Sequence, residues 1–132
     1  MTYELYNNLT RRVEFIALSL EDGLRLILDS KGKFSLIIND IKESDVFEIK
    51  KDSLLNVYVP ESIQLGRIIY SSAFGWKTNL YVGSHVVDGG SYCESIFEEA
   101  RLWSKENPDK LVKLEIWAID GQGLPLGLNN IR

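Results

Sequence analysis

The sequence predicts an α+β fold in which a mainly antiparallel sheet carries one helix packed on one face. About six to eight short segments have the alternating or β-branched pattern of strands, whereas one segment has a clear helical period. Helical and extended segments do not alternate as a parallel crossover fold requires, and no internal repeat is visible. With 132 residues, of which 45% are hydrophobic, the chain fits a single globular domain, residues 1–132.

The first thirty residues allow more than one interpretation. Residues 2–12 suit either a short strand or a first helical turn. For residues 13–30 we favour two strands, residues 13–20 and 24–28, joined by a turn that contains Gly23.

A helix is the rival interpretation of residues 19–30. Ser19 would cap it, with Asp22 at the third position, and Gly32 would end it. Gly23 would then lie inside the helix, where glycine costs about 1 kcal/mol relative to alanine. We prefer the strands because of that cost.

Further strands are expected along the middle of the chain. Residues 34–38 form an apolar run, and residues 77–82 are rich in β-prone types. We expect residues 77–82 to form a hairpin with the segment across the turn at Gly75. The other strand candidates in this region are residues 45–49, 54–59 and 63–70.

The helix is expected from about Tyr92 to Glu106. Ser91 and Glu94 have the capping-box spacing, Gly89-Gly90 before them suits a tight turn, and Asn107-Pro108 ends the helix. Its apolar face comprises Tyr92, Ile96, Phe97, Ala100 and Trp103.

A strand is expected over residues 111–119, directly after this helix. One of its faces is wholly apolar, and it comprises Val112, Leu114, Ile116 and Ala118. The other face is mixed and includes Trp117.

Composition narrows the class of function. The net charge is −4, from 19 acidic and 15 basic residues, and no Lys/Arg cluster suggests a nucleic-acid partner. No apolar run approaches the ~20 residues that cross a bilayer, so we expect no membrane association. The start of the chain lacks a secretory signal and Cys93 is the single cysteine, which indicates a cytoplasmic protein. With one histidine and one cysteine, we expect neither a metal nor a cofactor.

A thiol-dependent enzyme is one functional alternative. His85, Asp88 and Cys93 lie close in sequence at the start of the expected helix, where the helix dipole would favour a thiolate. Catalysis would require His85 within hydrogen-bond reach of Cys93, with Asp88 orienting the imidazole. A lone cysteine on a helix is more often a small packing residue. Another alternative is a small-ligand pocket between sheet and helix, lined by Tyr92 and Trp103.

Elimination favours a non-enzymatic protein-binding module. In general profile the chain is similar to bacterial immunity proteins, which block a cognate toxin by covering its active site. That similarity implies an inhibitor of one specific, basic protein partner such as a bacterial toxin. The acids on the outer helix face would also serve solubility alone. The residues expected to bind the partner are acids of the helix and aromatics around Gly75, namely Glu94, Glu98, Glu99, Phe74, Trp76 and Tyr81.

Overall fold

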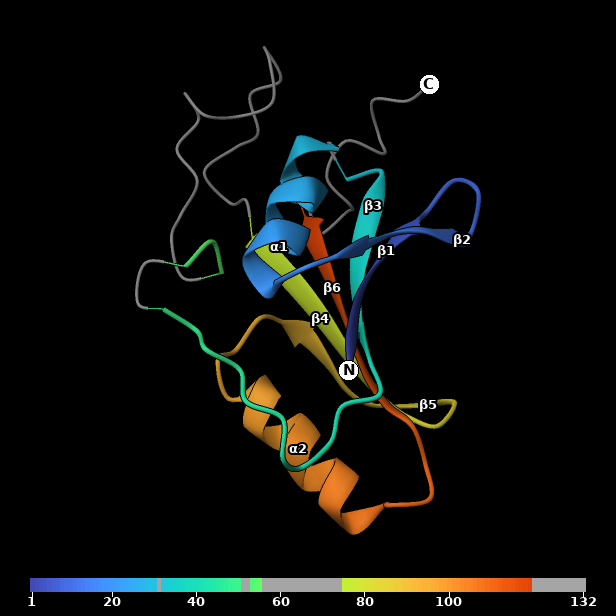
Figure 1. The fold of residues 1–132 in the computed structure, drawn as a ribbon, viewed down its shortest axis with the longest axis vertical. Helices are drawn as coiled ribbons and strands as arrows, with labels where there is room; N and C mark the ends of the chain where they lie inside the picture. The colour runs from blue at the N-terminus through green and yellow to red at the C-terminus, as the bar shows by residue number, and fades with distance from the viewer. Residues whose placement is uncertain (31, 51–52, 56–74, 120–132) are drawn as a thin grey trace.

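The structure is a computed structural model that describes residues 1–30, 32–50, 53–55 and 75–119. These residues form one six-stranded antiparallel sheet, in the order β2-β1-β3-β6-β4-β5, and two helices (Figure 1). This architecture confirms the predicted α+β class. The elements along the chain are β1 (Thr2–Asn7), β2 (Arg12–Ala17), α1 (Leu20–Asp29), β3 (Phe34–Asn39), β4 (Gly75–Val82), β5 (His85–Ser91), α2 (Ile96–Glu106) and β6 (Val112–Ile119).

The described elements repeat one ββαβ arrangement. In the first half the hairpin β1-β2 is followed by α1 and by β3, which pairs with β1. In the second half the hairpin β4-β5 is followed by α2 and by β6, which pairs with β4. The halves meet where β3 pairs with β6, so β2 and β5 are the two edge strands. The sequence shows no repeat, so this symmetry lies in the topology alone.

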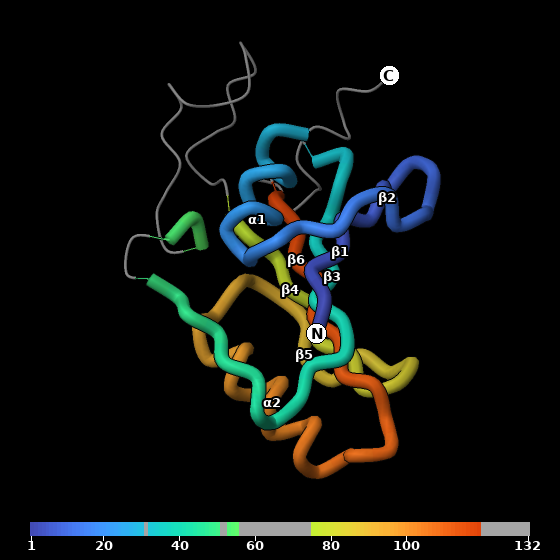
Figure 2. Tube along the Cα trace, viewed as in Figure 1, coloured from blue at the N-terminus to red at the C-terminus, as the bar shows by residue number. Residues whose placement is uncertain are grey.

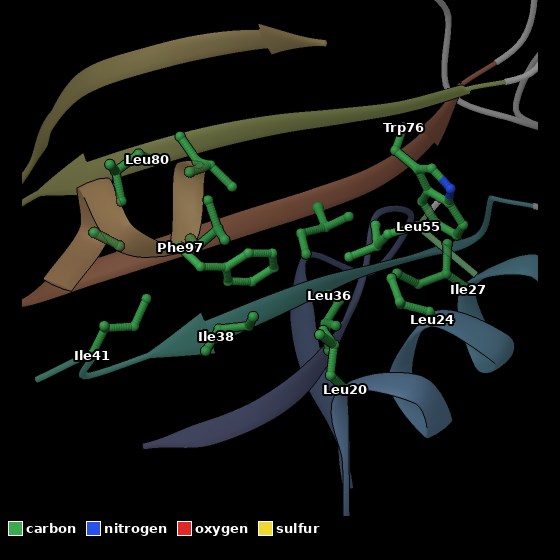
Figure 3. Packing of buried hydrophobic residues seen from close by; sticks show 14 of the residues in the cluster. Leu20, Leu24, Ile27, Leu36, Ile38, Ile41, Leu55, Trp76, Leu80 and Phe97 are labelled. Carbon is green, nitrogen blue, oxygen red and sulfur yellow. The ribbon is translucent and has the colours of Figure 1, made fainter. Parts of the chain in front are cut away.

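The core lies between the helices and one face of the sheet (Figure 3). Strand residues on this face alternate with residues on the opposite face, as the predicted pattern of residues 111–119 requires. The fully buried strand residues there include Leu5, Leu36, Ile38, Leu80, Val112, Leu114 and Ile116. The buried helix residues include Leu24, Ile27, Ile96, Phe97 and Ala100.

The chain after β3 passes alongside α2 without forming a strand (Figure 2). Phe47 packs against Phe97 with ring centroids 4.8 Å apart, and the Arg101 Nε–H donates to the Glu43 carbonyl at 2.9 Å. The strand predicted at residues 45–49 is therefore wrong. Of the strand predicted at residues 54–59, residues 54–55 form a turn, and residues 56–59 lie outside the described residues. The strand predicted at residues 63–70 lies wholly outside them.

Residues 24–28 belong to α1, so the strand predicted there is also wrong and the rival helix is correct. The Ser19 hydroxyl accepts a hydrogen bond from the Asp22 backbone N–H at 3.1 Å, as a helix cap requires. Gly23 lies where the helix meets the sheet, and a Cβ atom added there would lie 2.8 Å from the Leu36 Cδ1. Glycine thus serves close packing of α1 on β3, which outweighs its low helix propensity. Before α1, residues 2–7 form a strand, one of the two conformations left open for them.

The second helix starts later than predicted. Ser91 is the last residue of β5, and α2 begins at Ile96 after Ser95, whose side chain makes no capping hydrogen bond. The expected capping box is therefore absent. Gly89-Gly90, predicted as a tight turn, lie within β5 opposite Asn79 and Thr78. Asn107 ends the helix as predicted.

The strands of the second half are largely as predicted, but one pairing differs. β4 covers the predicted residues 77–82, and β6 covers all but the first residue of 111–119. β4 pairs with β5 on one side and β6 on the other, so the expected hairpin across Gly75 is wrong. Neither helix in the described part of the chain is long and apolar enough to cross a membrane.

Candidate docking site

Acidic side chains gather where the edge strand β5 meets the start of α2. Asp88 is an exposed residue of β5, Glu94 is exposed in the turn that follows, and Glu98 and Glu99 lie in the first turn of α2. We name these four residues the acidic cluster. The strand, the turn and the helix meet here because α2 packs on β4 and β6, and β4 is the neighbour of β5.

Asp88 and Glu99 interact directly across the junction between β5 and α2. Burial raises the pKa of Glu99, and a hydrogen bond with Asp88 and the negative charge of Asp88 raise it further. The indole N–H of Trp103 donates to Glu99 Oε1 at 3.4 Å, which acts in the opposite direction. Two carboxyl groups therefore share one small region, where they concentrate negative potential.

The other two acids differ in their partners. Glu98 forms an ion pair with Arg101, with 2.8 Å between Oε2 and the guanidinium nitrogen, so part of its charge is balanced. Glu94 forms no ion pair within the described residues, and its charge adds to burial in raising the pKa of Tyr92 to about 12. Asp88 and Glu99 also form no ion pair with the cationic side chains that the structure describes. The cluster therefore carries uncompensated negative charge.

Cys93 lies beside this cluster and is exposed. Its Sγ lies 3.1 Å from the Ser95 hydroxyl, and hydrogen bonds from Ser95 lower the pKa of the thiol, although Asp88 and Glu94 oppose this by their charge. His85 lies at the far end of β5 from Cys93, where it pairs with Val82. Six residue steps separate the two ends of β5, which corresponds to about 20 Å.

The structure therefore does not bring His85 and Cys93 together as a base and a nucleophile. Asp88 lies nearer to the thiol, where its charge disfavours the thiolate. No group of three or more His, Cys, Asp or Glu side chains that could hold a metal occurs among the described residues.

The predicted aromatic part of the docking surface is dispersed. Trp76 is 6% exposed on the core side of β4, and its indole N–H donates to the Leu54 carbonyl at 2.9 Å. Tyr81 points to the other face of β4, away from α2, and Phe74 lies outside the described residues. Of the six predicted docking residues, the structure brings together the three glutamates.

Asp88 was not among the predicted docking residues, although the structure places it beside Glu99 in the acidic cluster. From the sequence, Asp88 was expected to orient the imidazole of His85, because it lies near His85 and Cys93 in the chain. The pairing of Asp88 with Leu80 in β4 places its side chain on the same sheet face as α2. No local pattern in residues 85–91 indicates this position, because it depends on the pairing of β5 with β4.

A second polar cluster occupies the opposite face of the sheet. Glu115 accepts hydrogen bonds from Asn79 at 3.5 Å and Tyr81 at 3.4 Å, and burial raises its pKa. Lys113 lies over the Tyr81 ring at 4.6 Å, and Lys77 lies near Glu115 in the sheet. The lysines balance the charge of the Glu115 carboxylate. The polar groups of this cluster therefore interact with one another on this face of the sheet.

The pocket proposed for a small ligand does not take the expected form. Tyr92 and Trp103 are partly buried side chains that pack against the core. A surface groove of about 620 Å³ lies instead between residues 42–44 and α2, and charged side chains such as Lys42, Glu43 and Lys105 line it. Small-molecule pockets are mostly apolar, so this groove does not favour that class.

The fold and the acidic cluster together define an antiparallel α+β protein with a negatively charged sheet edge. Comparison with known protein families, with curated proteins and with solved structures finds no match. The function must therefore be inferred from the surface itself.

Proposed function

We propose that this chain is a non-enzymatic protein-binding module that docks a basic protein partner on the acidic cluster. The observation that carries the proposal is the close approach of Asp88 and Glu99 without a compensating cation among the described side chains. When both carboxyl groups are ionised, their mutual repulsion raises the energy of the free protein. A lysine or arginine from a partner would remove that cost on binding.

The location of the cluster supports docking. Glu94 and Asp88 are exposed, and the net charge of −4 would attract a basic partner over a distance set by the ionic strength. Arg101 pairs with Glu98 at the rim and could be displaced by a partner cation, since exposed ion pairs contribute about 0–1 kcal/mol.

An inhibitor of the immunity type is the particular role we propose for such a module. The chain would cover a cationic active-site region of one cognate protein, such as a bacterial toxin, and so exclude its substrate. The small size and acidic charge support this role.

Partner capture with a charge-reversed variant tests the docking proposal. The variant carries Glu94→Lys, Glu98→Lys and Glu99→Lys, and the matched control reverses the exposed acids Glu48, Glu106 and Asp109 to lysine, which changes the net charge equally. We expect the wild type and the control to capture the same basic protein from a lysate of the source cells, and the cluster variant to lose it. Equal capture by both variants would contradict the proposal.

The inhibitory role needs a separate measurement on the captured partner. We expect an equimolar amount of this chain to suppress the partner's activity, and the suppression to weaken as salt rises from about 50 to 500 mM. If the bound partner keeps its full activity, the proposed binding role would stand, but the proposed inhibitory role would be refuted.

A further inference from the structure

The edge strand β2 exposes large apolar side chains on both faces of the sheet. Phe15 lies opposite Leu5, on the face that carries the core, and Ile16 lies opposite Glu4, on the other face. Five of the eleven exposed large hydrophobic residues in the described part of the chain lie on β2, in the bend after it, or on the adjoining side of α1. We name them the β2 patch, which comprises Val13, Phe15, Ile16, Leu18 and Leu26. Leu18 is 92% exposed, and a groove of about 360 Å³ lined by Ile16, Leu18 and Leu26 lies between β2 and α1.

The backbone of β2 also faces outward. As the first strand in the sheet order, β2 pairs only with β1 among the described strands, so half of its N–H and C=O groups point away from the sheet. Proteins usually protect such an edge with charged residues or prolines. On the other edge, β5 carries Asp88 and the exposed Val86, whereas β2 carries Arg12 and Glu14 together with the apolar patch. An extended strand with apolar side chains is therefore the partner that β2 fits.

Charges at the two ends of β2 indicate which strand this is. The exposed Arg11 and Arg12 lie at its start, whereas Glu21 and Asp22 lie in the first turn of α1, just beyond its end. Antiparallel pairing of β2 with β2 of another copy would place the arginines of each copy beside the acids of the other. The basic start of β2 would therefore attract the acidic region beyond the end of the other copy's β2 across a two-fold axis. Glu14 lies between these ends and accepts hydrogen bonds from Asn7 and Thr10.

The available apolar area suits a dimer of this kind. At roughly 170 Å² for a fully exposed large apolar side chain, the exposed fractions of the β2 patch add to about 500 Å² per copy, or about 1,000 Å² for two copies. Backbone and charged groups add to this. If the second copy covered all of this area, the total would reach the size of about 1,000 Å² that a specific interface needs.

We propose that β2 pairs antiparallel with β2 of a second copy, so that two chains form a two-fold dimer with one continuous sheet. β5 lies five strands away from β2, about 24 Å across the sheet, so both acidic clusters stay accessible at the outer edges (Figure 1). The dimer would present two docking sites, but it forms without a partner. Its test is therefore independent of the proposed function.

Sedimentation equilibrium of the full chain tests the dimer. We expect a mass of twice 15.1 kDa at about 100 μM and a reversible fall toward 15.1 kDa on dilution. Ile16→Lys, at an exposed edge position, should weaken dimerisation at least tenfold, and Val86→Lys on the opposite edge β5 should leave it unchanged. A monomer at every concentration, or equal effects of the two lysines, would overturn the proposal, as would larger open-ended assemblies.

A charge exchange tests the antiparallel arrangement. Arg12→Glu should weaken the dimer at least severalfold because it would bring a glutamate near the acidic region beyond the end of the other copy's β2, and adding Asp22→Arg should restore it. Failure of the second change to restore dimerisation would refute this arrangement. Circular dichroism of each variant confirms that a loss of mass does not come from unfolding.

Discussion

Replacing Gly23 by alanine tests how closely α1 packs on the sheet. Gly23 is buried in the first half of α1, and an added Cβ would lie 2.8 Å from Leu36 Cδ1 and 3.1 Å from Leu36 Cδ2. Leu36 is fully buried in β3 and lies between Leu5 of β1 and Ile116 of β6 in the sheet. Its side chain therefore has little room to move aside.

Two opposing effects determine the free energy of unfolding of Gly23→Ala. Alanine in place of glycine in a helix stabilises by up to about 1 kcal/mol. Overpacking a dense core costs about 1–3 kcal/mol. Because Leu36 is confined by neighbouring strands, we expect overpacking to dominate and the variant to lose about 1 kcal/mol.

Urea unfolding followed by tryptophan fluorescence measures this loss, and Leu36→Val supplies the control. Valine removes the terminal methyl groups that the added Cβ would meet, and alone it should cost about 1 kcal/mol. In the double variant the two losses should not add, because alanine at position 23 fills part of the space that valine leaves. We expect a coupling free energy of about 1 kcal/mol.

A more stable Gly23→Ala variant would refute this reasoning. A gain near the full helix propensity, together with additive effects of the two substitutions, would mean that α1 shifts away from β3 at little cost. Glycine would then not be required for the close approach of helix and sheet.

Three further predictions concern a helix cap, the acidic cluster and the thiol. Ser19→Ala removes the hydrogen bond to the first turn of α1 and should lower the free energy of unfolding by about 1 kcal/mol in the same urea assay. The raised pKa of Glu99 means that the folded state binds more protons than the unfolded state above pH 4.5, so its contribution to stability falls as pH rises through the raised pKa. Asp88→Asn should therefore raise the urea midpoint at pH 7 more than at pH 4, and an equal change at both pH values would contradict the interaction. Iodoacetamide should modify Cys93 in the folded protein, and Ser95→Ala should slow the reaction a few fold near pH 7, because the hydroxyl that lowers the pKa of the thiol is lost. An unchanged rate would show that Ser95 does not activate the thiol.

The elements with strong local periodicity were predictable, and those decided by packing were not. The apolar face of residues 112–118 alternates without interruption, and β6 follows it. For α1, the cap at Ser19 was visible in the sequence, but the cost of Gly23 in a helix led us to favour strands. That cost is real for an exposed helix, whereas here the close contact with Leu36 requires a residue without a side chain.

The candidate site was predictable only where its residues share one element. Glu98 and Glu99 belong to the predicted helix, but its start was predicted near Tyr92, so their place in the first turn of α2 did not follow from the pattern. Asp88 joins them through the pairing of β5 with β4, which no local pattern encodes. Trp76 and Tyr81 were grouped because of a presumed turn at Gly75, but in a strand an even and an odd position point to opposite faces.

The pairing of β3 with β6 has a consequence for how the chain folds. Each hairpin joins residues close in sequence, whereas Leu36 and Ile116 meet across about 80 positions of the chain. Closing so long a loop is slow, so we expect this pairing to limit the folding rate. Until it forms, each half exposes an apolar strand edge, with Leu36, Ile37 and Ile38 on one half and Leu114 and Ile116 on the other. The stage before the two halves join is therefore the one at which a chain is most exposed to aggregation.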